Sequence, residues 1–344
     1  MSKTYHSIQA LRFFAAFLVL AMHAGLYASE RLDASYSRYI WDAGSTGVDI
    51  FFIISGFVIT ISSRRLLHVG DGWRTFALRR ILRVVPLYWI LMTAKLFITA
   101  VIPSAALHST FEPYYVIASY LFLPAKGMGG AIFPYLGVGW TLNFEFLFYF
   151  IFGSALFFGL NVFKTCLVVF SLLGISSLLK NPSLPAISFY FDAIVLEFLF
   201  GMLLAKYVAY NPLVNIKIAL ALIILGAGFI LMPPNTLSGL PRFLWRGVPA
   251  LALVAGFVFL EQNIGNITPR WLSFLGDSSY ALYLSHPFIA PLAPILLYGI
   301  GVKDIFLSMS ASIVMSIGVA CVVWAMVDRP IYTNLTRRFL IGRG

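Results

Sequence analysis

The chain has 344 residues, of which 60% are hydrophobic and 11% charged, and its formal net charge is +11. A soluble domain of this length could not bury so much apolar surface, so the composition excludes that class and predicts an integral membrane protein. Apolar stretches of about 20 residues separated by short joints favour helical spans over an outer-membrane barrel.

Hydropathy in chain order predicts about ten transmembrane helices, at residues 8–27, 45–63, 82–102, 141–161, 163–179, 189–208, 215–232, 246–262, 278–299 and 305–327. A further apolar piece at 112–124 is too short to cross and is expected to be re-entrant or interfacial. The first span is too long, and carries too many polar groups, for a signal peptide.

The fold class expected is therefore an all-α integral membrane bundle with cytoplasmic N- and C-termini. This orientation follows from the positive-inside rule, because most basic residues lie in joints on the same side of the membrane as the N-terminus. One membrane domain is predicted over residues 1–335, followed by a short basic cytoplasmic tail at 336–344. Cys166 and Cys321 lie apart in apolar segments, which argues against a disulfide framework or a thiolate metal site.

The first span carries Arg12 near its cytoplasmic end and His23 in its outer half. Eleven residues of helix place the two side chains within roughly 20° of one face and about 16 Å apart along the axis. An imidazole away from water is expected to be neutral and able to accept a proton, as a general base must. The alternative is that Arg12 extends to the lipid headgroups and His23 bonds a backbone carbonyl.

Two carboxylates are predicted at comparable depth, Asp49 in the second span and Glu145 in the fourth. Thr141, Glu145 and Tyr149 recur every four residues and should share one helix face. A carboxylate in an apolar helix is costly unless it is paired, so each acid should face a polar interior. Either acid could instead make a structural hydrogen bond to a neighbouring helix or to an arginine in a loop.

The joint after the second span holds six arginines against one acid: Arg64, Arg65, Arg74, Arg79, Arg80 and Arg83. Arg79, Arg80 and Arg83 cluster on a helix that enters the membrane, where their guanidinium groups suit phosphates. Anionic lipid headgroups are the competing partner for such a segment.

The span near the C-terminal end opens with "GDSSYALYLSHP", in which Asp277 or Ser278 is predicted to cap the helix. Ser279, Tyr283 and His286 then follow on one face, before a kink at Pro287. Hydrogen bonding between helices is the alternative role for these polar groups.

These residues carry a resemblance to the acyltransferase 3 family of bacterial membrane O-acyltransferases. The pair Arg12 and His23, "GVDIFFIISGFVI", "LRRILRVVPLYW", "GWTLNFEFLFY", "GDSSYALYLSHP" and "VDRP" follow one another in the family's order. The chain has Asp328 where that last motif more often has glutamate. Any one match is weak, but together they cover nearly the whole chain.

The resemblance implies an acetyl-CoA-dependent O-acetyltransferase of the stand-alone exopolysaccharide type, in the bacterial cytoplasmic (inner) membrane. Its acceptor would be a hydroxyl of an extracytoplasmic or lipid-linked glycan, and no nucleic acid or metal is expected. The predicted catalytic residues are His23, Glu145 and Asp49. The predicted binding residues for the acyl donor are Arg12, Arg79, Arg80, Arg83, Ser279, Tyr283 and His286.

In the predicted mechanism His23 deprotonates the acceptor hydroxyl, which attacks the thioester, while Asp49 or Glu145 orients the imidazole. A transient acyl-histidine is a covalent alternative. Two other classes would also explain a polar bundle: a transporter or flippase of a lipid-linked or anionic saccharide, and a structural subunit of a secretion complex.

Overall fold

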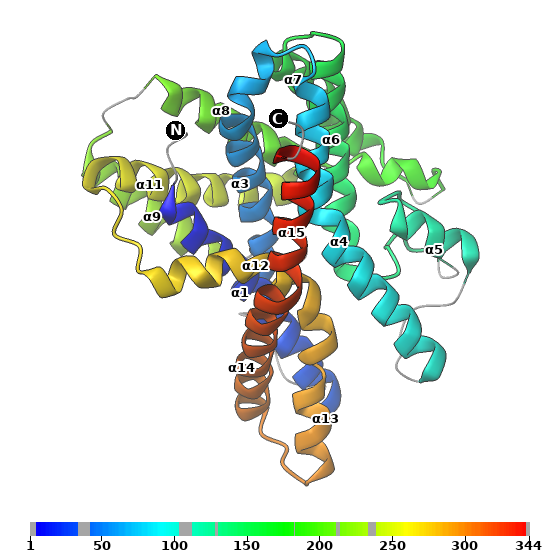
Figure 1. Cartoon of the computed structure of the whole chain (residues 1–344). Helices are drawn as coiled ribbons and strands as arrows, with labels where there is room; N and C mark the ends of the chain where they lie inside the picture. Colours follow the sequence, from blue (N-terminus) through cyan, green and yellow to red (C-terminus); the bar gives the residue numbers. More distant parts are fainter. Residues whose placement is uncertain are drawn as a thin grey trace. The chain divides into compact units, whose positions relative to one another are not determined.

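The computed structural model of the chain describes residues 5–33, 42–102, 112–127, 130–181, 183–210, 214–232 and 239–341. In these residues the chain is helical and forms no sheet; one isolated β-bridge joins Lys126 and Ile132. The prediction of an all-helical membrane protein is therefore confirmed. Figure 1 shows the helices in chain order.

Eight helices among the described residues are long and apolar enough to cross a membrane. They span His6–Leu32, Ala43–His68, Gly72–Val101, Gly137–Phe157, Val162–Leu179, Gly239–Ile264, Arg270–Gly299 and Ile305–Leu340. Two of the ten predicted spans form shorter helices, α8 (Leu196–Ala209) and α9 (Ile216–Ile230). The start of α8 is delayed because Asp192 bonds the backbone N–H of Ile194 and stabilises the short turn η7 (Ala193–Val195).

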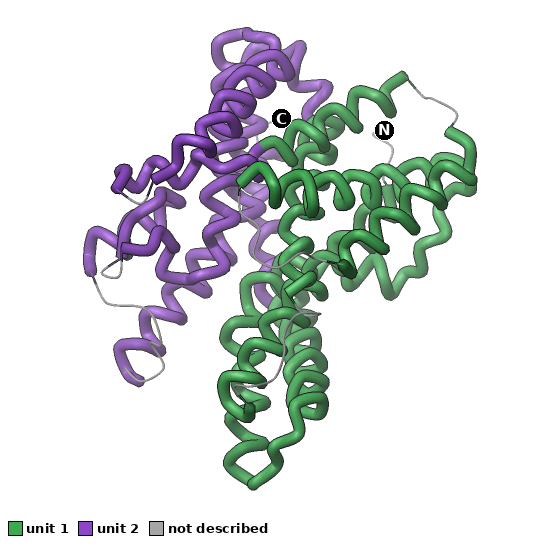
Figure 2. Tube along the Cα trace, turned by 180° about the vertical axis from the view of Figure 1, so that it is seen from behind, with its two compact units in different colours: residues 1–62, 196–325 green, residues 63–195, 326–344 purple. Residues whose placement is uncertain are grey.

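The chain divides into two compact units, which Figure 2 shows in different colours. Unit 1 comprises residues 1–62 and 196–325, and unit 2 comprises residues 63–195 and 326–344. The predicted domain boundary at residue 335 falls within the continuous helical segment formed by α15 (Arg329–Thr336) and η10 (Arg337–Ile341), and it stays a prediction.

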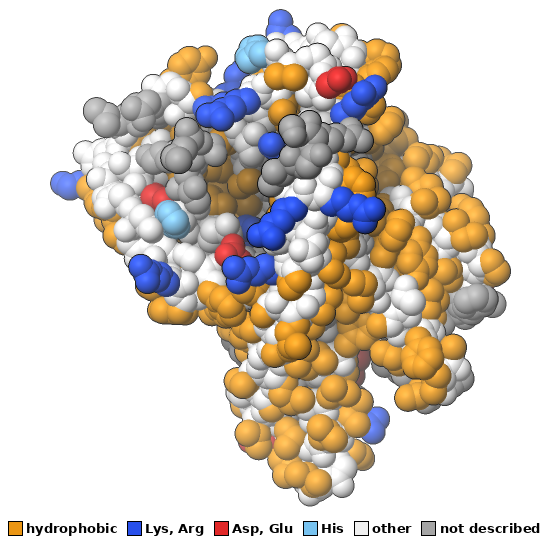
Figure 3. Space-filling model, viewed as in Figure 1, with side chains coloured by type: hydrophobic (Ala, Val, Ile, Leu, Met, Phe, Trp, Pro, Cys, Tyr) orange, Lys and Arg blue, Asp and Glu red, His pale blue; other side chains and the backbone are white. Residues whose placement is uncertain are grey.

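Unit 1 contains α1 (His6–Leu32), which packs against α12 and α14. Its other helical elements are η1 (Ala43–Ser45), α3 (Thr46–Ser63), α8, α9, α10 (Gly239–Arg242), η8 (Phe243–Gly247), α11 (Val248–Ile264), α12 (Arg270–Ile289), α13 (Leu292–Gly299), α14 (Ile305–Val323) and the first residues of η9 (Trp324–Asp328). Figure 3 shows hydrophobic side chains covering the visible face of α13 and α14, as expected for helices that face lipid.

Small residues allow close helix packing in unit 1. A Cβ atom at Gly276 of α12 would overlap the backbone carbonyl of Gln9 in α1, and one at Gly201 of α8 would overlap that of Ile53 in α3. Membrane helices use small residues in this way because lipid supplies no hydrophobic drive for their association.

The helix α12 begins at Arg270, so Asp277 and Ser278 lie inside it and the predicted cap is wrong. The apolar residues before Asp277 extend the helix by two turns.

Unit 2 contains η2 (Arg64–His68), α4 (Gly72–Val101), α5 (Pro113–Tyr120), η4 (Gly137–Gly139), α6 (Trp140–Phe157), α7 (Val162–Ser176), η5 (Ser177–Leu179), η6 (Ala186–Tyr190), η7, α15 and η10. The segment predicted to be re-entrant or interfacial forms α5, whose eight residues are too few to cross. It ends where Phe122 adopts a positive φ of 58°, and stacking on Phe146 at 3.8 Å holds that conformation. The Tyr88 hydroxyl donates to the Ser119 carbonyl at 3.1 Å and anchors α5 to α4.

Candidate functional site

His23 lies in the C-terminal half of α1 with its ring fixed by the backbone. Its Nδ1 is 2.9 Å from the carbonyl oxygen of Val19, one turn earlier. A carbonyl oxygen only accepts hydrogen bonds, so Nδ1 carries the proton of the neutral ring. The other nitrogen, Nε2, therefore presents a lone pair and can accept a proton.

His286 has the same arrangement on α12. Its Nδ1 is 3.1 Å from the carbonyl oxygen of Leu282, and its side chain is fully buried. Pro287 follows inside the helix and has no N–H to offer the carbonyl of Tyr283. Among the described residues, His286 Nε2 has no hydrogen-bond partner.

The packing of α1 on α12 brings the two histidine rings together. Their centroids lie 4.9 Å apart with the planes tilted by 53°. Tyr27 and Tyr283 extend this aromatic cluster, at 6.1 Å from His23 and His286 respectively. The sequence predicts His286 to be a donor-binding residue. No local sequence pattern indicates that its ring lies beside that of His23.

The other two residues of the predicted stripe on α12 are buried as well. Ser279 is fully buried, and its hydroxyl has no hydrogen-bond partner within the described part of the chain. The Tyr283 ring meets Phe51 of α3 edge-on, with 5.8 Å between centroids. The three polar groups on this face therefore point into the protein interior of unit 1.

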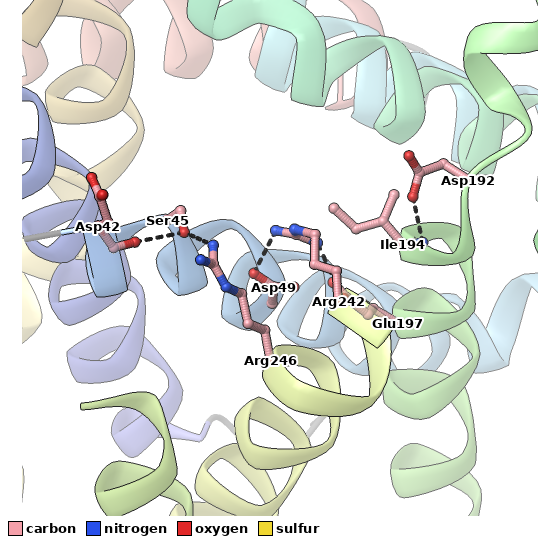
Figure 4. Close-up of polar contacts among 8 residues, drawn as sticks. All are labelled: Asp42, Ser45, Asp49, Asp192, Ile194, Glu197, Arg242 and Arg246. Carbon is pink, nitrogen blue, oxygen red and sulfur yellow. Dashed lines mark hydrogen bonds and ion pairs between the residues drawn. The ribbon is translucent and has the colours of Figure 1, made fainter. Parts of the chain in front are cut away.

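Asp49 forms an ion pair with an arginine, the alternative that the sequence left open without identifying the partner. Its Oδ2 accepts a hydrogen bond from Arg242 Nη2 at 2.8 Å, and Arg242 Nη1 lies 3.9 Å from Glu197 Oε1. Both carboxylates are fully buried, whereas the Arg242 side chain is 16% exposed. Figure 4 shows this cluster, in which α3, α8 and α10 each contribute one charge. Arg242 thus supplies the partner for Asp49, and for Glu197, which had no predicted partner.

A second arginine lies one turn further along. Arg246 Nη1 donates to the Ser45 hydroxyl, which in turn donates to the Asp42 carbonyl at 2.8 Å (Figure 4). The turn η1, which carries Ser45, packs on α1, because a Cβ atom at Gly44 would contact Leu18 and Met22. The cluster therefore ties the start of α3 to the stretch of α1 that carries His23.

Arg12, the second predicted residue on α1, donates from Nη1 to Gln9 Oε1 at 3.1 Å. The start of the same helix is held by Glu261 of α11. Its carboxylate accepts from the backbone N–H groups of His6 and Ser7, each at 2.8 Å, and from the Ser7 hydroxyl at 2.5 Å.

In unit 2, α4 carries the predicted arginine cluster. Arg83 Nη1 lies 2.8 Å from Asp328 Oδ2, and the guanidinium also lies over the Tyr332 ring, 5.7 Å from its centroid. Arg80 lies over the Phe76 ring at 5.9 Å. The side chain of Asp328 is only 4% exposed, so this last acid of the final sequence motif is engaged in a largely buried ion pair.

Glu145 is the other predicted catalytic acid, and it lies in unit 2. The Tyr149 hydroxyl donates to its Oε1 at 2.5 Å, which confirms that these two residues share one face of α6. Within the described residues, no group of three or more His, Cys, Asp or Glu side chains is arranged to hold a metal ion.

Buried ionisable groups in a multi-pass helical protein define a class: membrane proteins that do polar chemistry inside the bilayer. The family model of the acyltransferase 3 domain matches residues 5–327 of this chain. The chain therefore belongs to this acyltransferase family.

Curated relatives agree with this assignment. The chain is 32% identical over 302 residues to the exopolysaccharide production protein ExoZ of Rhizobium meliloti (strain 1021), covering 84% of this chain and 89% of that protein. It is 25% identical over 383 residues to the putative peptidoglycan O-acetyltransferase YrhL of Bacillus subtilis (strain 168), covering 98% of this chain and 57% of that protein. No solved structure matches the chain. The chain is therefore a multi-pass membrane acyltransferase.

Proposed function

We propose that this protein transfers an acyl group, acetyl in the first instance, from cytoplasmic acyl-CoA to a hydroxyl of an extracytoplasmic or lipid-linked glycan. The glycan acceptor is suggested by the two relatives, one named for exopolysaccharide production and the other for peptidoglycan O-acetylation. We place the reaction in the bacterial cytoplasmic membrane.

One observation carries the chemistry. The Val19 carbonyl holds the proton of His23 on Nδ1, which leaves Nε2 as the base. We assign to this nitrogen the removal of the acceptor's hydroxyl proton. As that O–H bond breaks, the oxygen attacks the thioester carbonyl carbon and forms the ester bond. The C–S bond then breaks, and the departing thiolate of CoA accepts from His23 Nε2 the proton that came from the acceptor hydroxyl.

We propose donor-binding residues in each unit, taken by itself. In unit 2, we assign Arg79, Arg80 and Arg83 to the phosphates of acyl-CoA, since guanidinium groups bind phosphate through paired hydrogen bonds. Within unit 1, we propose Arg12 as a phosphate-binding residue and Ser279 and Tyr283, on the buried face of α12, as further donor-binding residues. Asp328 already accepts from Arg83 Nη1, so a phosphate would have to bind through the other N–H groups of that guanidinium.

We assign the two acids different roles in this proposal. Asp49 is engaged with Arg242 and acts on the site by fixing the start of α3, rather than by orienting the imidazole. Glu145, bonded by Tyr149, remains a proposed catalytic acid.

The experiment is transfer of label from radioactive acetyl-CoA in nanodiscs, with candidate glycans as acceptors. Label released from the glycan by mild alkali is the expected result. Vectorial movement of saccharide with no consumption of acetyl-CoA would overturn the proposal in favour of a transporter.

Two variants test the division of roles. His23→Ala should lower kcat by about 100-fold or more while the KM for acetyl-CoA changes little. Arg80→Ala should chiefly raise that KM. The reverse pattern would contradict the assignments, and label on His23 that hydroxylamine releases at neutral pH would indicate a covalent acyl-histidine.

A further inference from the structure

We propose that His286 is a positioning residue that acts through His23, accepting a hydrogen bond from the proton that His23 takes up. This inference rests on the proposed function, in which His23 is the base. It differs from a role for His286 in binding the donor.

The first step is the tautomer of each ring. Both Nδ1 atoms bond a carbonyl oxygen one turn earlier on their own helix, His23 to Val19 and His286 to Leu282. Each neutral imidazole therefore presents a lone pair at Nε2. Two rings in this state have no proton to share, although their centroids are only 4.9 Å apart.

The second step is the unmet hydrogen-bonding capacity of His286. Its ring is fully buried, and Nε2 has no hydrogen-bond partner among the described residues. A buried acceptor without a donor is costly, so the fold maintains this arrangement against a free-energy penalty. The tyrosine beside it, Tyr283, contacts the His286 ring with 6.1 Å between centroids.

The third step is what one added proton does. When His23 Nε2 takes the acceptor's proton, it becomes a donor, and 4.9 Å between centroids allows two ring nitrogens to reach hydrogen-bond distance. A charged donor and a neutral acceptor then form a hydrogen bond that is absent before the proton moves. An interaction gained only as charge develops lowers the barrier rather than strengthening substrate binding.

The packing around the pair favours His286 over a carboxylate for this role. The acid of the GVD motif, Asp49, is already held by Arg242 at 2.8 Å. On α14, the buried side chains Ser308, Ser312 and Ser316 are hydroxyls, and Ser312 donates to the Ala290 carbonyl just after α12. These neighbours offer hydroxyls and an ion-paired carboxylate, whereas His286 offers a neutral ring nitrogen beside His23.

The test compares His286→Leu with His286→Gln, which keeps an acceptor atom. Native membranes from a deletion strain supply the acceptor, and radioactive acetyl-CoA is the donor. His286→Leu should lower kcat about 10- to 100-fold, the range for losing one hydrogen bond to a charged group, without raising KM. His286→Gln should stay within about threefold of the unchanged protein.

Leu284→Ala is the matched packing control, because Leu284 is fully buried on the same helix. It should lower the unfolding temperature without lowering kcat. An equal loss of kcat in Leu284→Ala and His286→Leu, or equal losses in His286→Leu and His286→Gln, would overturn the inference.

A double-mutant cycle separates this inference from the proposed function. In a His23→Gln background, His286→Leu should change the residual rate by less than about twofold, since the two residues act as a unit. Full activity of His23→Gln would overturn both proposals. Loss of activity in His23→Gln with normal kcat in His286→Leu would overturn the role of His286 alone.

Discussion

Arg83 on α4 and Asp328 at the end of η9 form an ion pair at 2.8 Å within unit 2. The two residues are 245 positions apart in the chain, so the pair ties the last motif of the sequence to the arginine-rich helix. The Arg83 side chain is 25% exposed and that of Asp328 is 4% exposed.

Removing either partner of this pair should destabilise the protein. We expect Asp328→Asn and Arg83→Gln each to lower the free energy of unfolding by roughly 1–3 kcal/mol, between the values for exposed and buried pairs. Thermal unfolding in one detergent measures this loss, and Asp328→Glu is the control that keeps the charge. If Arg83 binds donor phosphate, Arg83→Gln should also raise the KM for acetyl-CoA more than Asp328→Asn does. Equal KM values would leave Arg83 with a structural role only.

Arg242 should be more important to stability than either of its acidic partners. Arg242→Leu leaves the buried carboxylates of Asp49 and Glu197 without their cation, so we expect a loss of roughly 3–5 kcal/mol. Adding Glu197→Gln to Arg242→Leu should recover part of it, because one buried charge is then removed. Chemical denaturation of the single and double variants checks this order, and no recovery would show that the cluster is not electrostatic.

Glu261 should stabilise the start of α1 by accepting three hydrogen bonds. Glu261→Ala is expected to cost about 1–2 kcal/mol, as for the loss of a strong N-terminal cap, and Glu261→Gln should cost less because one amide oxygen still accepts. Amide hydrogen exchange at residues 6–9 measures the effect directly. Glu30→Gln, an exposed acid at the other end of α1, is the matched control and should leave that exchange unchanged.

Close packing of α3 on α8 should make Gly201 intolerant of a side chain. A Cβ atom there would overlap the Ile53 carbonyl and approach the Gly56 backbone, so Gly201→Ala should separate the helices and lower the unfolding temperature. Gly228→Ala on α9 is the control, because nothing lies within 4 Å of its Cβ position. That change should be neutral, or stabilise the helix by up to about 1 kcal/mol. Equal effects at both positions would argue against close contact of α3 and α8.

The local predictions that succeeded depend on neighbours in sequence. Apolar runs identified the long helices, and the spacing of Glu145 and Tyr149 placed them on one face, because helix periodicity is a property of consecutive residues. Helix ends were less predictable. The side chain of Asp192 shortens the predicted span near α8, while apolar residues before Asp277 lengthen α12.

The membrane-embedded class, the approximate positions of the helices and the individual residues of interest could be predicted from hydropathy and motif order, because both depend only on the order of residues in the chain. The partners of these residues became known from the fold: His286 lies beside His23, Arg242 pairs with Asp49, and Glu261 binds the start of α1. These pairs join residues that are far apart in sequence, and which side chains meet depends on helix packing that no local pattern encodes. The free energy of burying a charge or an imidazole is set by that partner, so the chemistry of each group follows from the packing.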